Sequence, residues 1–248
     1  MAPVDELLRR TGFAFRARWR VFLAIMAIEV LGRYAILLST VVAVFVALLG
    51  AAAFTLPSLD PAAIADAAKN AFSMMPSIGL ILAALATVIL GLCALALFET
   101  WILASVFYAA ENQTESVSEC LKAGMTHFNG FGWVLTLWSL VVMAGLVFFV
   151  LPGLVLAMLY WFAPVVYFRE GKRGWAAMSR AREWLTGGRL APVALRLGVM
   201  LALVMACAMI ASLSPIPFSS DLFGIASVPF AVLFQIALSR ELDGGTPA

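Results

Sequence analysis

Charged side chains are scarce in this chain. Only 12% of its 248 residues are Asp, Glu, Lys or Arg, whereas an ordinary globular domain carries about 25%. Hydrophobic residues make up 64% of the sequence, and the mean hydropathy is +1.02. A water-soluble fold of this size could not cover so much apolar surface, because water favours the burial of apolar groups. The composition therefore predicts that lipid is the main solvent.

Histidine and cysteine are also scarce, which bears on catalysis and metal binding. The single histidine, His127, has no nucleophile or carboxylate partner in any recognisable motif. Cys93, Cys120 and Cys207 lack CxxC spacing and lie in or beside apolar stretches, as is typical of small buried hydrophobic residues. The sequence contains no HExxH motif, paired aspartates or serine–histidine arrangement. We therefore predict a non-enzymatic protein with no catalytic residue, metal or cofactor.

Long apolar segments predict an all-α polytopic membrane protein. A helix crosses about 30 Å of hydrocarbon with roughly 20 apolar residues, and it satisfies its own backbone polar groups there. The segment from residue 21 is too long for a secretory signal, whose apolar region has about 7–15 residues, so we expect an uncleaved first helix. The expected transmembrane segments, forming three hairpins in one domain spanning 1–248, are 21–54, 77–110, 131–151, 153–168, 190–213 and 222–238.

The positions of lysine and arginine predict the orientation in the membrane. Positive charge stays on the cytoplasmic side of short loops during insertion. Eleven cations precede the first segment or lie between the fourth and fifth: Arg9, Arg10, Arg16, Arg18, Arg20, Arg169, Lys172, Arg173, Arg180, Arg182 and Arg189. Lys69 is the only cation in the three opposite loops. We expect both termini in the cytoplasm of a bacterium, with the protein in its inner membrane.

The residues between the apolar segments predict the structure of the connections. Asp60-Pro61 predicts a short capped helix in the first outer loop. Leu151-Pro152-Gly153 predicts a tight turn between the third and fourth segments, and the prolines within 214–221 predict a helix-free link. Apolar residues spaced by three and four, with charges between them, recur at 8–22, 116–128 and 175–185. These three segments are expected to be amphipathic helices in the cytoplasmic interface.

Three charges in apolar stretches predict a polar cluster. Aligning the outer ends of the first two segments places Arg33 beside Glu99, and Glu29 precedes Arg33 by four residues, a favourable helical spacing for an ion pair. One hypothesis is a site for an ion, a proton or a lipid headgroup, because charges in a bilayer are costly and seldom kept without use. The other is structural pairing near the membrane edge, where long side chains reach water. The sequence leaves both hypotheses open.

Two further groups of side chains have alternative interpretations. Arg173, Arg180 and Arg182 form a candidate site for anionic lipid headgroups, although cytoplasmic positive charge alone would also place arginines there. Aromatic residues near segment ends are typical anchors in the headgroup region, and we expect this role for Trp101, Trp133, Trp138, Trp161, Tyr34, Tyr108, Tyr160 and Tyr167. The net charge of +2 gives no reason to expect nucleic-acid binding.

The order of features over residues 112–196 resembles a known family. After a capped helix and an apolar segment come Leu151-Pro152-Gly153, another apolar segment, Arg169-Glu170-Gly171, and Ala177-Met178-Ser179-Arg180-Ala181 running to Leu185-Thr186-Gly187. This order resembles the YciC-like bacterial membrane proteins and the membrane domain fused to glycerophosphoryl diester phosphodiesterases. Ala181 stands where that family usually has serine. The resemblance implies six helices and a link to membrane lipids, but no catalytic residues.

Three functional hypotheses follow from the sequence. The first is a protein that organises, senses or helps to move lipids or other amphiphiles, with membrane lipids and either a second copy or another membrane protein as partners. Small residues along the second segment, such as Gly79, Ala83 and Gly91, favour such helix association. The second is a small transporter or channel, although the sequence shows no broken helix. The third is a membrane-embedded lipid enzyme, which the missing motifs disfavour.

Overall fold

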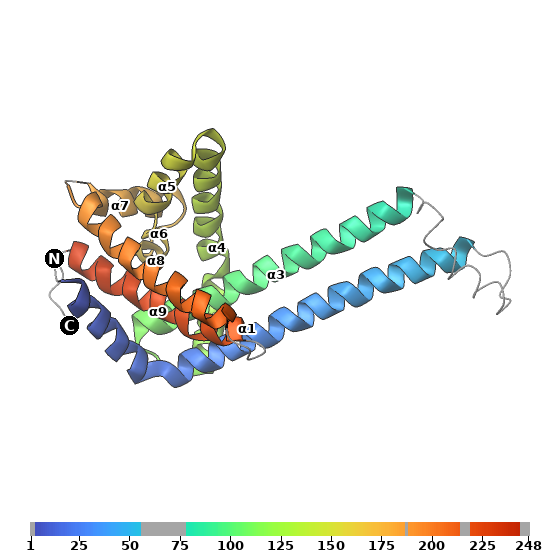
Figure 1. Cartoon of the computed structure of the whole chain (residues 1–248), viewed down its shortest axis with the longest axis horizontal. Coiled ribbons are helices and arrows are strands. Elements are labelled where there is room, and N and C mark those ends of the chain that lie inside the picture. Colours follow the sequence, from blue (N-terminus) through green and yellow to red (C-terminus); the bar gives the residue numbers. More distant parts are fainter. Residues whose placement is uncertain (1–2, 56–77, 187, 214–218, 244–248) are drawn as a thin grey trace. The chain divides into compact units, whose positions relative to one another are not determined.

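Helices make up most of the part of the chain that the structure describes. The computed structural model describes residues 3–55, 78–186, 188–213 and 219–243, and none of these residues forms a strand. The helices, labelled in Figure 1, are α1 (Val4–Thr55), α3 (Ile78–Asn112), α4 (Val117–Phe148), α5 (Val150–Leu159), α6 (Ala163–Glu170), α7 (Trp175–Leu185), α8 (Leu190–Leu213) and α9 (Ser219–Leu242). The predicted all-α fold is confirmed.

Within the described residues, six helical stretches are long and apolar enough to cross a membrane, as predicted. They are Val4–Ala47, Ile81–Asn112, Val117–Phe148, Val150–Glu170, Leu190–Leu213 and Phe223–Leu242. Large apolar side chains cover their outer surfaces: Leu38, Val41, Leu90 and Ile210 are each 64–70% exposed. Only hydrocarbon makes such a surface favourable. The chain is an integral membrane protein with several membrane-spanning helices.

Two predicted connections fall largely outside the described residues. The outer-loop helix expected after Asp60 lies entirely there. The helix-free link expected at 214–221 lies there as far as residue 218, and α9 already begins at Ser219. Thus the last three residues of that predicted link are helical.

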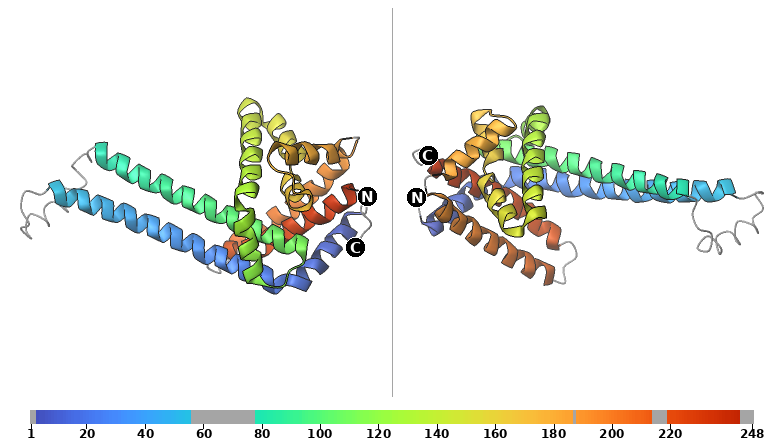
Figure 2. Two further views of the ribbon diagram at one scale, coloured as in Figure 1. Left: turned by 180° about the vertical axis from the view of Figure 1, so that it is seen from behind. Right: turned by 90° about the horizontal axis from the view of Figure 1, so that it is seen from above.

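The contacts divide the chain into two compact units. Glu29–Glu99 forms one unit, and Met1–Ile28 together with Thr100–Ala248 forms the other. In the first, α1 and α3 run side by side (Figures 1 and 2). Gly32 of α1 faces Phe98 of α3. Thr40, which comes later in α1, faces Gly91, which comes earlier in α3. The two helices are therefore antiparallel, as the predicted first hairpin requires.

The larger unit holds the aromatic core. Phe22, Phe131, Phe162 and Phe234 are fully buried, and they come from α1, α4, the link before α6, and α9. Burying a side chain of this size stabilises the fold by about 1.5–3 kcal/mol in water, and in lipid tight packing replaces much of that term. This core fixes the helices that surround the candidate site.

The predicted amphipathic segment at 116–128 is not a separate helix. Residues 117–148 form the single helix α4, about 48 Å long at 1.5 Å per residue. No proline interrupts this stretch, and Gly130 lies within the helix close to Tyr167. The segment therefore continues the membrane helix, and the predicted separate interfacial helix is wrong. By contrast, α1 bends at Arg18 (φ −126°, ψ 16°), which separates its amphipathic start from its apolar part.

The predicted amphipathic segment at 175–185 is a separate helix, α7. Its apolar side is buried against protein, however, since Met178, Ala181 and Leu185 are at most 2% exposed. α7 contacts α4, α5, α6 and α9. Its apolar face therefore packs against neighbouring helices and does not lie against lipid, although Trp175 stays 59% exposed.

The turn between the third and fourth spans is shorter than predicted. Only Phe149, with an extended backbone, separates α4 from α5, and Pro152 lies inside the first turn of α5. Proline is tolerated there because the first helical N–H groups have no helical acceptor. A Cβ on Gly145 would lie 2.8 Å from Gly153 Cα, so two glycines allow the backbones to meet. The hairpin depends on this close approach.

We expect Gly145→Ala to destabilise the α4–α5 hairpin, because the new methyl group would collide with the backbone at Gly153. Overpacking of this kind costs about 1–3 kcal/mol. Gly198→Ala is the matched control, since nothing lies within 4 Å of that position. Thermal unfolding in detergent should show a lower midpoint for Gly145→Ala and an unchanged or higher midpoint for Gly198→Ala. Equal midpoints for the two variants would contradict the close approach.

The fourth span, predicted as one helix over 153–168, is broken. Helix α5 ends at Leu159, residues 160–162 form a turn, and α6 begins at Ala163 with Pro164 in its first turn. Proline has no N–H and fits the start of a helix better than its interior. A broken span, which the sequence did not reveal, is therefore part of the fold.

Candidate functional site

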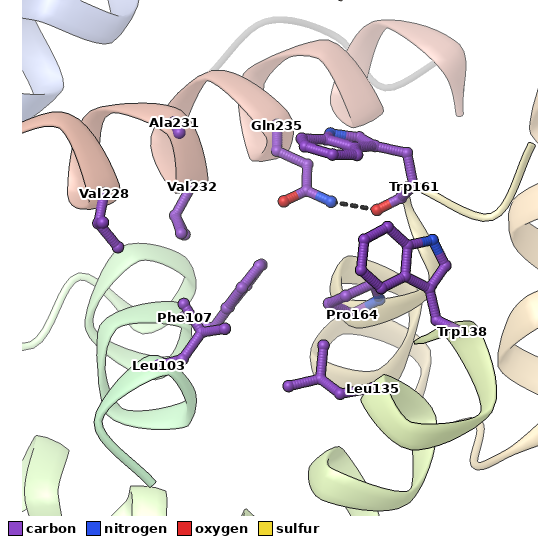
Figure 3. Close-up of a pocket in the computed structure, with 10 residues that line it drawn as sticks. All are labelled: Leu103, Phe107, Leu135, Trp138, Trp161, Pro164, Val228, Ala231, Val232 and Gln235. Carbon is purple, nitrogen blue, oxygen red and sulfur yellow. Dashed lines mark hydrogen bonds between the residues drawn. The ribbon is translucent and has the colours of Figure 1, made fainter. Parts of the chain in front are cut away.

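A pocket lies at the break in the fourth span, within the larger unit (Figure 3). Its volume is about 210 Å³, and it is partly open to the surroundings. Helices α3, α4, α6 and α9 contribute its walls. The lining residues are Leu103, Phe107, Leu135, Trp138, Trp161, Pro164, Val228, Ala231, Val232 and Gln235. None of them is charged.

The break is stabilised by partners for its carbonyl groups. Ala163 N donates to Tyr160 O at 3.0 Å, and Val166 N donates to Phe162 O at 3.0 Å. Between them, Trp161 O accepts a hydrogen bond from Gln235 Nε2 of α9. Backbone carbonyls without partners would be costly in hydrocarbon. The side chain of Gln235 therefore makes the interruption compatible with a membrane.

Gln235 and Trp161 are the polar side chains of the pocket with remaining hydrogen-bonding capacity, and Trp161 Nε1 is buried without a hydrogen-bond partner among the described residues. Gln235 is 6% exposed and is the only charged or amide residue in the predicted segment 222–238. Figure 3 shows its amide nitrogen directed to Trp161 and its amide oxygen directed away from that bond, beside the pocket. A side-chain amide has two N–H groups and one acceptor oxygen. One N–H and the oxygen are left for another partner.

Two indole rings form one wall of the pocket. The rings of Trp138 and Trp161 meet edge to face, with centroids 6.3 Å apart and an interplanar angle of 75°. Trp138 Nε1 donates to Ala157 O at 3.4 Å, which fixes the ring from the other side. The sequence predicted these tryptophans as interfacial anchors. In the structure they line the pocket and pack against each other.

The predicted cluster of Glu29, Arg33 and Glu99 is brought together within the smaller unit. Arg33 Nη2 donates to Glu29 Oε1, and the same nitrogen lies 3.3 Å from Glu99 Oε1. The side chain of Glu29 is 8% exposed, whereas those of Arg33 and Glu99 are 37% and 46% exposed. One guanidinium thus serves two carboxylates, one of them buried. This geometry fits either hypothesis for the cluster, function or structure.

The three arginines predicted to contact lipid headgroups have different environments. Arg180 reaches Glu170 at 3.0 Å, Glu183 at 3.1 Å and Asp243 at 3.6 Å. Its hydrogen bonds to Glu170 and then Glu183 raise its pKa, so its charge is fixed and already compensated. Arg173 and Arg182 are exposed, and within the described residues neither forms an ion pair. These two remain candidates for headgroup contact.

A second ion network was missed by the sequence analysis. Glu111 at the end of α3 pairs with Arg169 at 3.4 Å and Arg240 at 3.7 Å. Asp243 links Arg169 at 3.9 Å to Arg180. Glu111, Arg169 and Arg240 lie in the last turns of α3, α6 and α9. Asp243 directly follows α9, and Arg180 lies within α7. Charges placed just beyond apolar segments were the available signal, but only the folded structure shows which of them meet.

His127 is packed among aromatic rings. Its Nδ1 lies 3.2 Å from Tyr167 Oη, and the Tyr167 hydroxyl is also 3.2 Å from His127 O. The rings of Tyr108 and Phe168 pack against it, with centroids 6.1 and 5.3 Å away. His127 is half-buried, and its contacts with Tyr167 and Phe168 join α4 to α6.

Comparisons with protein-family models, with curated proteins and with solved structures gave no match for this chain. The resemblance to YciC-like proteins therefore stays a prediction. Within the described residues, no group of three or more histidine, cysteine, aspartate or glutamate side chains is placed to hold a metal ion.

We expect Arg33→Ala to lower the stability of the chain, because it leaves the buried carboxylate of Glu29 without its guanidinium partner. The expected loss is about 1.5–3 kcal/mol, the contribution of a hydrogen bond to a charged group. Arg10→Ala is a matched control, because Arg10 pairs with Glu6 at the same spacing while both side chains are well exposed. Exposed pairs contribute little.

Thermal unfolding and the yield of monodisperse protein in detergent test this prediction. A second variant, Glu29→Gln with Arg33→Ala, should recover part of the loss because the buried charge is removed. Unchanged yield and midpoint for Arg33→Ala would contradict a stabilising role. Loss of bound lipid at normal yield would instead favour the functional hypothesis.

Proposed function

We propose that this chain is a non-enzymatic inner-membrane protein that binds a lipid or another amphiphile and helps to organise or move it. The observation that carries the proposal is the apolar pocket at the broken fourth span, bordered by one buried amide (Figure 3). Ligand sites are typically concave, mostly apolar, and equipped with a few polar groups that fix orientation. This pocket has those properties.

The surroundings favour an amphiphile as the ligand. The pocket is formed by helices that are long and apolar enough to span a membrane, so lipid is the most concentrated molecule beside it. Its volume of about 210 Å³ exceeds the roughly 150 Å³ of an engineered apolar cavity that binds benzene. It is therefore large enough for part of a lipid chain.

The exposed cations support an interaction with anionic headgroups and a cytoplasmic position for this end of the protein. Arg173 and Arg182 are exposed, and basic residues near a membrane surface attract anionic lipid by about 1 kcal/mol each. On this basis both termini are proposed to be cytoplasmic, following the positive charge in the sequence. Membership of the YciC-like group is part of the same proposal and rests on the order of features over residues 112–196.

We expect Ala231→Phe to reduce the lipid that copurifies with the protein, because Ala231 lines the pocket and a phenyl ring would occupy it. Ala206→Phe is the matched control, since Ala206 is an exposed alanine of the membrane-spanning helix α8. Protein purified in mild detergent would be extracted and its lipid quantified by mass spectrometry. Bound lipid should fall at least threefold for Ala231→Phe only.

Equal lipid content in the two variants, at equal yield and equal thermal unfolding midpoint, would contradict the pocket as the binding site. Changing Arg173 and Arg182 to Ala tests the headgroup contribution separately. A selective loss of anionic lipid in that variant is expected if the exposed arginines hold headgroups.

A small transporter is the second candidate, and the broken fourth span favours it. Secondary transporters place substrate sites at interrupted helices, where backbone groups lie next to a cavity. Uptake of a solute by vesicles containing the purified chain, abolished by Ala231→Phe, would favour transport. Exchange of labelled lipid between leaflets without solute uptake would favour lipid handling.

A further inference from the structure

We infer that the pocket takes an uncharged, single-chain amphiphile whose hydroxyl group hydrogen-bonds to Gln235. This inference rests on the proposed lipid-binding function and specifies its ligand. It follows from the size of the pocket, the absence of charge in its lining and the unused capacity of one amide. Each of these points excludes a class of lipid.

The volume of the pocket fits part of one chain and not a complete two-chain lipid. Sites for drug-sized ligands usually have about 300–1,000 Å³, whereas this pocket has about 210 Å³. Only a segment of one chain with a small head group fits, and the remainder of the ligand lies along the open side of the pocket.

The lining excludes an ionised head group. The ten lining residues include no Asp, Glu, Lys or Arg, so a charge there would have no counterion among them. Burying an ionised group without a partner is far more costly than burying a hydroxyl. Sulfate, phosphate and carboxylate head groups are therefore disfavoured in the pocket itself.

Gln235 supplies a matching polar contact. Its Nε2 is held by Trp161 O, and this bond orients the amide so that the oxygen lies beside the pocket (Figure 3). The oxygen accepts from a hydroxyl, and the second N–H can donate to it. Of the two indole N–H groups in the lining, Trp138 Nε1 is already bonded to Ala157 O, whereas Trp161 Nε1 is buried without a hydrogen-bond partner among the described residues. A hydroxyl, which both donates and accepts, complements the amide.

The probes for a test share one brominated chain and differ in head group. Bromine quenches tryptophan fluorescence on contact, and Trp138 and Trp161 line the pocket. The three probes are a monoacylglycerol, the corresponding diacylglycerol, and the same chain ending in a sulfate. Each is titrated into the full chain in nanodiscs. The part of the quenching that is absent in the Ala231→Phe variant is taken as the signal from the pocket.

The monoacylglycerol is expected to give this signal saturably, at concentrations at least tenfold lower than either other probe. Gln235→Met, which keeps the length of the side chain and removes its hydrogen bonds, should weaken monoacylglycerol binding about three- to tenfold. Comparison of the three probes on the unaltered chain remains decisive if Gln235→Met does not fold.

Two other results overturn the inference in distinguishable ways. Equal or tighter binding of the sulfate or the diacylglycerol, with the signal still lost in Ala231→Phe, refutes the uncharged single-chain ligand but leaves lipid binding in place. No signal sensitive to Ala231→Phe from any probe refutes both the inference and the proposed function. Unchanged binding in correctly folded Gln235→Met refutes the contact with the amide.

Discussion

The structure depends on one constraint, that a backbone in hydrocarbon must find its hydrogen-bond partners within the protein. Continuous helices meet this constraint by themselves, and most of this chain consists of them. Within the described residues, one break in a membrane-spanning stretch is the turn at residues 160–162, where the carbonyl of Trp161 accepts from Gln235 of another helix. The break therefore requires the amide of Gln235, and the oxygen of that amide lies beside the pocket. The constraint that permits the interruption also gives the candidate site its polar group.

Hydropathy predicted the six spans because length and apolarity are local properties of the sequence. The Glu29, Arg33 and Glu99 contacts were also predictable, since charges in apolar stretches are rare and a hairpin fixes their register. The break in the fourth span was not predictable in this way. Pro164 is compatible with either a helix start or a kink, and only tertiary packing decides between them. Gln235 was visible as a lone amide, but its partner is 74 residues away in the chain.

The charged side of the larger unit shows why the presence of arginines in a segment does not identify the ones that can contact lipid headgroups. Arg180 is held by three carboxylates from different segments, whereas Arg182, two positions later, is exposed. A helical sequence predicts that both lie near the surface, but it does not show which one meets Glu170 and Asp243. The arginines therefore divide into those that join helix ends and those that can meet headgroups. The same distinction applies to α7, whose apolar face packs on protein and not on lipid.

The central claim is that hydrocarbon covers the outer surface, and Cys93 tests it most directly. This thiol is exposed in the structure and lies on α3, six residues before Glu99 in a stretch without charge. In intact membranes a water-soluble maleimide should leave Cys93 unlabelled until detergent is added, while a cysteine at the exposed position Ser118 reacts at once. Labelling of Cys93 in intact membranes at the rate of the Ser118→Cys control would contradict the account.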